Sequence, residues 1–342
     1  MNRSTRAFAA VFALVAAATV AWVGYRAYGL YAAPLIERDA VVRFPSGGEP
    51  QQIIDTLYAR ELVRDTAELR ERLEQLDFDY RSGQFRLDSG MSARDFVRKL
   101  RLGKQEEARI VLTHGRVLGD VAAQATRFVE ADSAALHDAI LDSLWLRQRD
   151  LDEATAMSLL VPNTYNVFWD ATAEELRDRL AEEAERFWAR DGRLARADSL
   201  GLTPLEVYTL ASIVESETKV DAEKPTVAGV YLNRLRRGIK LDADPTVIYA
   251  LGDFSIRRVL YEHLEYDSPY NTYLYAGLPP GPIAMPSIAS IDAVLAPEPH
   301  DYLFFVAKAD GTGTHAFARN MTGHARNIAA FQRNLRARGI RR

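Results

Sequence analysis

The chain has 342 residues, 48% of them hydrophobic, and its 43 basic and 47 acidic side chains leave a net charge of −4. This length and composition are sufficient for more than one domain with a buried core, while the charge balance excludes a polyanion-binding surface over the whole molecule. No nucleic-acid partner is therefore expected, and the absence of cysteine excludes disulfides, thiolate catalysis and cysteine-ligated metals.

The N-terminus combines a short basic segment, residues 1–6, with an uncharged run from Ala7 to Tyr25. A helix of that length rises about 28 Å, close to the hydrocarbon thickness of a bilayer. Basic residues before the run predict a cytoplasmic start. We therefore predict a single-pass anchor over residues 7–25 in the cell (inner) membrane, with the bulk of the chain on the extracytoplasmic side. A cleaved signal peptide is the alternative, because Ala16-Ala17-Ala18 resembles a cleavage site.

Residues 41–130 contain a weak threefold repeat of a short strand, a glycine turn and a helix. The turns include Gly47, Gly90 and Gly115, and each is followed by apolar residues at helical spacing. Units of this size are too short and too few for a solenoid, so they predict a small α+β module. Chance similarity between ordinary strand–helix units is the alternative reading.

The remainder, residues 131–336, is predicted to form a larger mixed α+β domain. Helices are expected over 132–158 and 173–190, and a hairpin followed by a closing helix over 302–335. Thr203 and Glu206 form a capping-box pattern around Pro204, which predicts a helix that begins there and runs through Glu217. Asp221 is expected to cap the next helix, which ends at Gly238.

One carboxylate of this helix falls among apolar and aromatic residues. At about 100° per residue, Glu215 shares a stripe with Tyr208 and Ala211. Glu206 and Glu217 fall together on the opposite side, where solvent is expected. Burial and the helix dipole both predict a raised pKa for Glu215, as a general acid requires. A glutamate whose stem packs on the core while its head reaches water fits the pattern too, and geometry alone favours it.

Other polar clusters are less specific. Tyr270-Asn271-Thr272-Tyr273 offers hydroxyl, amide and aromatic groups that suit a carbohydrate, although a turn of packed tyrosines is equally consistent. Asp242 and Asp244 beside Pro245 have the character of turn formers. The six histidines show no paired ligand spacing, so neither a metal nor another cofactor is expected.

Seven sequence blocks between about residues 203 and 324 resemble, in order and spacing, the endolytic murein transglycosylases (YceG-like). The blocks are LASIVESET (210–218), VAGVYLNRL (227–235), DPTVIY (244–249), SPYNTY (268–273), GLPPGPI (277–283), DYLFFVA (301–307) and HAF (315–317). Two departures from the family pattern are Ser216, where lysine is frequent, and Thr113-His114-Gly115, where Pro-Glu-Gly is usual.

The resemblance implies a lyase that cleaves the bond between N-acetylmuramic acid and N-acetylglucosamine without water and leaves a 1,6-anhydro end. It implies Glu215 as the single catalytic acid/base, which protonates the leaving oxygen and then accepts the proton of the sugar's 6-hydroxyl. Five further residues are predicted to position the sugar or Glu215: Asn233, Asp244, Thr246, Asn271 and Tyr273.

The resemblance also implies a LysM-like character for residues 41–130 and a place in a peptidoglycan-synthesis complex, with synthases as partners. Two alternatives stay open. One is a peptidoglycan hydrolase in which Asp242, Asp244 or Glu217 supplies a second carboxylate. The other is a noncatalytic, membrane-anchored scaffold that binds glycan strands.

Overall fold

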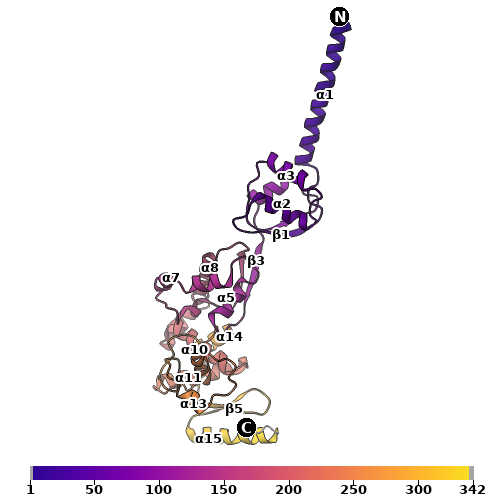
Figure 1. Ribbon diagram of the computed structural model, residues 1–342. Helices are drawn as coiled ribbons and strands as arrows, with labels where there is room; N and C mark the ends of the chain where they lie inside the picture. The colour runs from indigo at the N-terminus through magenta and orange to yellow at the C-terminus, as the bar shows by residue number, and fades with distance from the viewer. Residues whose placement is uncertain (1–2, 339–342) are drawn as a thin grey trace. The chain divides into compact units, whose positions relative to one another are not determined.

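The computed structural model describes residues 3–338, which form helices joined by three two-stranded sheets (Figure 1). The predicted mixed α+β class is therefore confirmed. The chain packs as two compact units. The first unit contains residues 3–109, 128–130 and 166–171; the second contains residues 110–127, 131–165 and 172–338.

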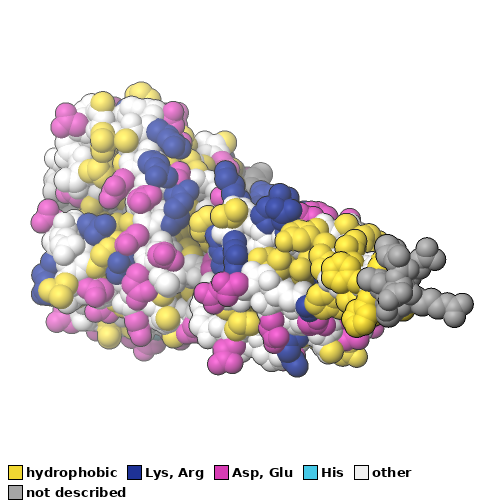
Figure 2. Space-filling view, turned by 90° about the horizontal axis from the view of Figure 1, so that it is seen from above, with side chains coloured by type: hydrophobic (Ala, Val, Ile, Leu, Met, Phe, Trp, Pro, Cys, Tyr) yellow, Lys and Arg dark blue, Asp and Glu magenta, His cyan; other side chains and the backbone are white. Residues whose placement is uncertain are grey.

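The first helix, α1 (Arg3–Tyr31), contains the predicted anchor. Its segment Ala7–Tyr31 has a mean hydropathy of 2.1 and buries none of its most apolar stretch, so it is long and apolar enough to cross a membrane. Figure 2 shows hydrophobic side chains gathered towards the right-hand end of the view. The helix extends beyond the predicted boundary at Tyr25, and it is the one such helix among residues 3–338.

The core of the first unit lies between one small sheet and three helices. Strands β1 (Ala40–Phe44) and β2 (Gly83–Leu87) pair antiparallel. The helices are α2 (Pro50–Ala59), α3 (Thr66–Gln75) and α4 (Ala93–Leu102). Side chains that point inward from all five elements are fully buried, among them Phe44, Leu57, Leu69, Phe85 and Phe96. This alternation of buried and exposed positions is what the predicted strand–helix pattern requires.

The third predicted strand–helix unit, which turns at Gly115, lies in the second compact unit, whereas the first two lie in the first. Strand β3 (Glu107–Leu112) pairs with β4 (Asn163–Phe168), and the helix that follows, α5 (Leu118–Thr126), packs with α6 (Ser133–Ile140) in the second unit. The boundaries 41–130 and the LysM-like character of this segment stay predictions.

The second unit is mainly helical. Its remaining elements are α7 (Ser143–Arg147), η1 (Ala156–Leu159), α8 (Ala173–Ala189), α9 (Arg193–Leu200), α10 (Pro204–Glu217), η2 (Asp221–Glu223), α11 (Lys224–Arg236), α12 (Asp244–Leu251), α13 (Tyr261–Leu264), α14 (Ile288–Leu295), β5 (Phe304–Ala307), β6 (His315–Ala318) and α15 (Met321–Ala337). The predicted terminal hairpin and closing helix are therefore confirmed. β5 and β6 pair antiparallel, and α15 packs on both strands.

Helix α10 is the centre of this unit, because every residue from 207 to 214 is buried. It packs against α11 and α14 (Figure 1). The predicted capping box is present: the Thr203 hydroxyl accepts from the Glu206 backbone N–H at 3.2 Å, and the Glu206 carboxylate accepts from the Thr203 N–H at 2.7 Å.

Two predicted helix boundaries were wrong. Residues 132–158 form α6, α7 and the turn η1 instead of one helix, because the Asp142 carboxylate accepts from the backbone N–H groups of Leu144 and Trp145 and starts a new helix. Asp221 opens the short η2 instead of capping α11, and its carboxylate pairs with the Lys224 ammonium at 2.7 Å.

Candidate active site

The last turn of α10 presents Glu215 and Glu217 to two different cavities. The Glu215 cavity, of about 680 Å³, is lined by Thr113, His114, Gly115, Arg116, Glu215, Ser216, Lys219, Pro245, Ile248, Tyr249, Phe254, Ile256, Ile283, Ala284 and Met285. The Glu217 cavity, of about 330 Å³, is lined by Glu217, Tyr231, Arg234, Leu241, Asp242, Asp244, Tyr273, Leu303, Phe304, Phe305, Met321 and His324. Both cavities lie within the second unit.

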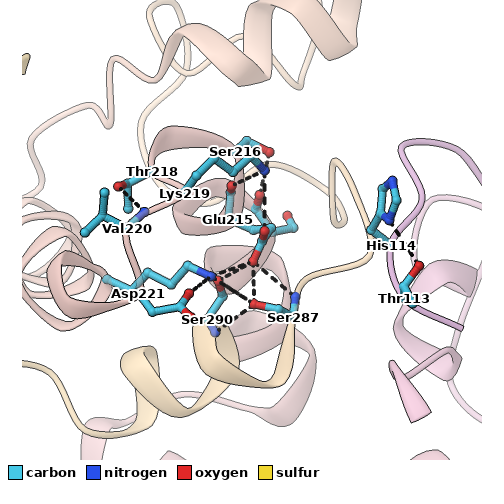
Figure 3. A network of polar contacts seen from close by, with 12 residues as sticks. Thr113, His114, Glu215, Ser216, Thr218, Lys219, Val220, Asp221, Ser287 and Ser290 are labelled. Atoms are coloured by element: carbon cyan, nitrogen blue, oxygen red, sulfur yellow. Dashed lines mark hydrogen bonds and ion pairs between the residues drawn. The ribbon is translucent and has the colours of Figure 1, made fainter. Parts of the chain in front are cut away.

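The Glu215 carboxylate is held by groups from α11 and from the start of α14. Its Oε2 accepts from the hydroxyls of Ser287 at 2.5 Å and Ser290 at 2.7 Å, and from the Lys224 ammonium at 3.0 Å (Figure 3). The Lys224 side chain is 4% exposed and the Glu215 side chain 17%. On the outer side, Lys219 lies 3.4 Å from Oε1. Glu215 thus joins α10 to α11 through the ion pair with Lys224 and to α14 through hydrogen bonds from the two serines.

This network makes Glu215 an unusually strong acid. Burial alone raises its pKa, but the hydrogen bonds from Ser287, Ser290 and Lys224, together with the Lys224 charge, outweigh burial and lower the pKa from 4.5 to about 2. The raised pKa predicted from the helical wheel was therefore wrong. A wheel describes one helix, whereas the groups that decide this pKa come from α11 and α14.

The Glu217 carboxyl has the opposite character. Its Oε1 accepts from the Tyr231 hydroxyl at 2.6 Å. Burial raises its pKa, the Tyr231 hydrogen bond lowers it and the negative charge of Asp244 raises it again, so that the pKa reaches about 7. The predicted solvent-facing position of Glu217 was wrong, because Tyr231 of α11 and the side chains that line its cavity partly bury it.

Further polar groups face Glu217 across its cavity. Tyr273 donates its hydroxyl hydrogen to Asp244 at 2.7 Å, and burial together with this bond places the pKa of Tyr273 far above its usual range. Arg234 pairs with Asp242 at 2.9 Å. Burial lowers the pKa of His324, so its imidazole is neutral at pH 7. The cavity thus offers hydroxyl, carboxylate and imidazole groups around one protonatable carboxyl.

Of the five residues predicted to position the sugar, Asp244 and Tyr273 line the Glu217 cavity together. The other three line neither cavity and hold loops in place. Asn233 donates to the carbonyls of residues 300 and 302, and Asn271 to those of residues 264 and 266. Thr246 is fully buried and bonds the Thr272 hydroxyl at 2.9 Å. Their roles in sugar binding stay predictions.

Sequence reasoning did not select Lys224, Ser287, Ser290, Tyr231, Arg234 or His324. Tyr231 and Arg234 stand in the block 227–235, three positions apart, so helical spacing alone places them on one face of α11. The serines carried no such signal, because their importance depends on the approach of α14 to α10. Within residues 3–338, no group of three or more histidine, aspartate or glutamate side chains is arranged to hold a metal ion.

Comparison with known proteins places these features in a family. The YceG-like family matches residues 42–330. An endolytic murein transglycosylase of Bacillus subtilis is 27% identical over 83% of this chain and 84% of its own. One of Streptococcus pneumoniae is 28% identical over 90% of this chain, which spans 62% of that relative's length. The crystal structure of a YceG-like protein from Listeria monocytogenes matches with a TM-score of 0.56 and 26% identity, over 85% of this chain and 99% of that one. Because the family match extends over most of the chain, the protein belongs to the YceG-like family.

Proposed function

We propose that the protein is an endolytic murein transglycosylase that cleaves peptidoglycan strands between N-acetylmuramic acid and N-acetylglucosamine and leaves a 1,6-anhydro end. Membership of the YceG-like family and the names of two relatives support this reaction class. The observation that carries the assignment is the Glu217 cavity, where a carboxyl with a pKa of about 7 is surrounded by hydroxyl and carboxylate groups.

Glu217 is the better general acid of the two carboxylates. A general acid must hold a proton at the working pH and release it in the transition state. With a pKa of about 7, Glu217 is about half protonated at neutral pH. Glu215, with a pKa of about 2, is ionised and compensated by Lys224. We therefore assign the acid/base role to Glu217 and a positioning role to Glu215, whose predicted catalytic role then rests on the family resemblance alone.

The proposed reaction conserves all atoms of the glycan. Protonated Glu217 donates its proton to the glycosidic oxygen, and the bond from that oxygen to the muramic C1 breaks. The resulting Glu217 carboxylate accepts the proton of the 6-hydroxyl while the 6-oxygen bonds to C1. The negative charge of Asp244, which already acts on Glu217, would stabilise the positive charge that develops on the sugar ring.

A peptidoglycan hydrolase is the second candidate, because Asp244 lies in the same cavity as Glu217 and could serve as a second carboxylate. The two reactions differ in their products. Digestion of purified glycan strands followed by mass spectrometry should give only ends that are one water lighter than reducing ends. Reducing ends as the main product would exclude the transglycosylase, and no cleavage by the folded wild-type protein would favour a glycan-binding scaffold.

The apolar helix α1 supports a position of the enzyme at the membrane. An apolar helix after a basic N-terminus would hold the protein in the inner membrane, with both units on the side where peptidoglycan is made. Glycan binding by a LysM-like module over residues 41–130 and association with peptidoglycan synthases belong to the same proposal and rest on the family resemblance. Protease protection in spheroplasts tests the orientation: the second unit should be digested from outside, and protection of it would contradict the anchor.

A further inference from the structure

The Glu215 cavity is not explained by proton transfer at Glu217. Its volume of about 680 Å³ is in the range of small-molecule sites. Aliphatic side chains form part of its wall, with Ile283 and Met285 buried and Ile248 partly exposed. Such groups stabilise methyl and methylene groups of a ligand and offer nothing to sugar hydroxyls.

The rim of this cavity is cationic. Lys219 and Arg116 are exposed, and Lys219 is 80% accessible. The Arg116 guanidinium lies 5.4 Å from the Phe254 ring, and its Nη1 donates to the Phe254 carbonyl at 3.2 Å. These contacts orient the guanidinium, while its other N–H donors stay available for a ligand. Glu215 is the one carboxylate in the wall, against the two cations Arg116 and Lys219, and it also pairs with the buried Lys224. The cavity therefore favours an anionic ligand.

The Glu217 cavity has the opposite charge. Three carboxyl groups line it, from Glu217, Asp242 and Asp244, against the single guanidinium of Arg234. An anionic group is disfavoured there, whereas the uncharged hydroxyls of a sugar can accept and donate hydrogen bonds. The two cavities thus differ in ligand chemistry although they belong to the same helix end.

The two cavities are lined by residues that are neighbours in the sequence. Ser216 lines one and Glu217 the other, and Asp244 and Pro245 are divided in the same way. Consecutive Cα atoms are about 3.8 Å apart, and an extended peptide advances about 3.3–3.6 Å per residue. A group attached to a sugar next to Glu217 has to pass the end of α10 or the Asp244–Pro245 loop to reach the Glu215 cavity, and three extended residues advance about 10 Å, which is about the diameter of a helix. His114 and Thr113 face that cavity from the side opposite Glu215 (Figure 3).

Peptidoglycan carries such a group. Each muramic acid has a lactyl ether to which a short peptide is attached, and this stem peptide contains alanine methyl groups and free carboxylates. We propose that the Glu215 cavity binds the stem peptide of the muramic acid cleaved at Glu217, with Arg116 and Lys219 pairing its carboxylates and the aliphatic wall receiving its apolar groups. This inference rests on the proposed function, because it takes peptidoglycan as the substrate.

The test compares two substrates with the full-length protein: glycan strands with intact stem peptides, and the same strands after an amidase has removed them. The measured quantity is the kcat/KM on peptide-bearing strands divided by the kcat/KM on bare strands. Arg116→Glu reverses a charge at the rim and should lower this ratio about tenfold, because one charge-assisted hydrogen bond is lost. His114→Glu adds a negative charge on the same wall and should lower the ratio in the same direction. Arg237→Glu is the matched control, since Arg237 is exposed and lines neither cavity.

The outcomes separate the inference from the proposed function. If the wild-type protein cuts neither substrate, the proposed function fails. If it cuts both, and Arg116→Glu and His114→Glu leave the ratio within about twofold of that of Arg237→Glu, only the peptide site fails. If kcat/KM falls equally on both substrates in variants that melt at the wild-type temperature, the Glu215 cavity binds the glycan itself. That result would overturn the inference.

Discussion

Glu215 and Glu217 lie two positions apart at the end of α10, yet the pKa values of their carboxyl groups are shifted in opposite directions. Glu215 meets a buried ammonium and two serine hydroxyls, and its pKa falls to about 2. Glu217 meets one tyrosine hydroxyl and a neighbouring carboxylate in a partly buried cavity, and its pKa rises to about 7. The helix supplies both carboxyl groups, but their acidity depends on which other elements approach them. One carboxyl is therefore fit to hold helices together and the other to transfer a proton.

The largest difference expected between the two carboxyl groups is in their effect on catalysis. Glu217→Gln keeps the shape of the side chain and removes its proton, so kcat on glycan strands should fall by about 10²–10⁴-fold. Glu215→Gln is the matched control on the same helix and should reduce kcat far less in protein that remains folded. Steady-state kinetics at a temperature well below both melting transitions measures the two. Full activity in Glu217→Gln would contradict the assignment.

The next effect is on stability. Lys224→Met removes the buried cation and leaves Glu215 with the exposed Lys219 as its remaining partner charge, so the free energy of unfolding should fall by up to about 3–5 kcal/mol. Urea denaturation followed by tryptophan fluorescence measures it. Combining Lys224→Met with Glu215→Gln removes the stranded charge and should recover part of the loss. If the double variant is less stable than Lys224→Met by the full effect of Glu215→Gln, the two groups do not interact.

The comparison also shows what sequence could predict. The apolar N-terminal helix, the capping box at Thr203 and the terminal hairpin follow from local patterns, and they are present in the structure. The lowered pKa of Glu215 does not follow from a local pattern, because Lys224 and Ser287 are 9 and 72 positions away along the chain. Of the predicted sugar-positioning residues, Asp244 and Tyr273 meet in one cavity. Thr246 shares the block of Asp244 but is buried, and motif membership does not reveal burial.

A smaller effect concerns the pH dependence of stability at Glu217. Its pKa is about 7 in the fold and 4.5 in the ordinary state, so the folded protein binds this proton more tightly and loses stability as pH rises from 4.5 to 7. Glu217→Gln, which has no proton to lose, should match the wild type below pH 4.5 and exceed it by up to about 3 kcal/mol above pH 7. Thermal melts at pH 4 and pH 8 test this, and equal differences at both values would contradict it.

The contribution of Glu215 to stability should change with pH in the opposite direction. Its pKa is lowered to about 2 from 4.5, so the stability it contributes is complete above pH 4.5 and is lost as pH falls through 2. Glu215→Gln should therefore be less stable than the wild type at pH 7, and the deficit should shrink between pH 4.5 and 2. If acid titrations show that the difference in stability stays constant over this range, the variant loses stability through packing and not through charge.

The smallest effect is a shift in the acidity of Glu217. Its hydrogen bond from Tyr231 lowers the pKa, so Tyr231→Phe should raise it by about one unit and move the alkaline limit of activity upward. Tyr275→Phe removes a hydroxyl from an exposed tyrosine that lines neither cavity and serves as the control. A downward shift in Tyr231→Phe would mean that the hydroxyl stabilises the protonated form.

The pH profile of kcat/KM for the wild-type enzyme on bare glycan strands tests the central claim, that Glu217 is the proton carrier, most directly. Because the protonated form of Glu217 begins the reaction and its pKa is about 7, kcat/KM should fall above pH 7 with the loss of one proton, and it should do so in Glu215→Gln as well. A profile that is flat from about pH 6 to 9, or a decline that disappears in Glu215→Gln, would contradict the account.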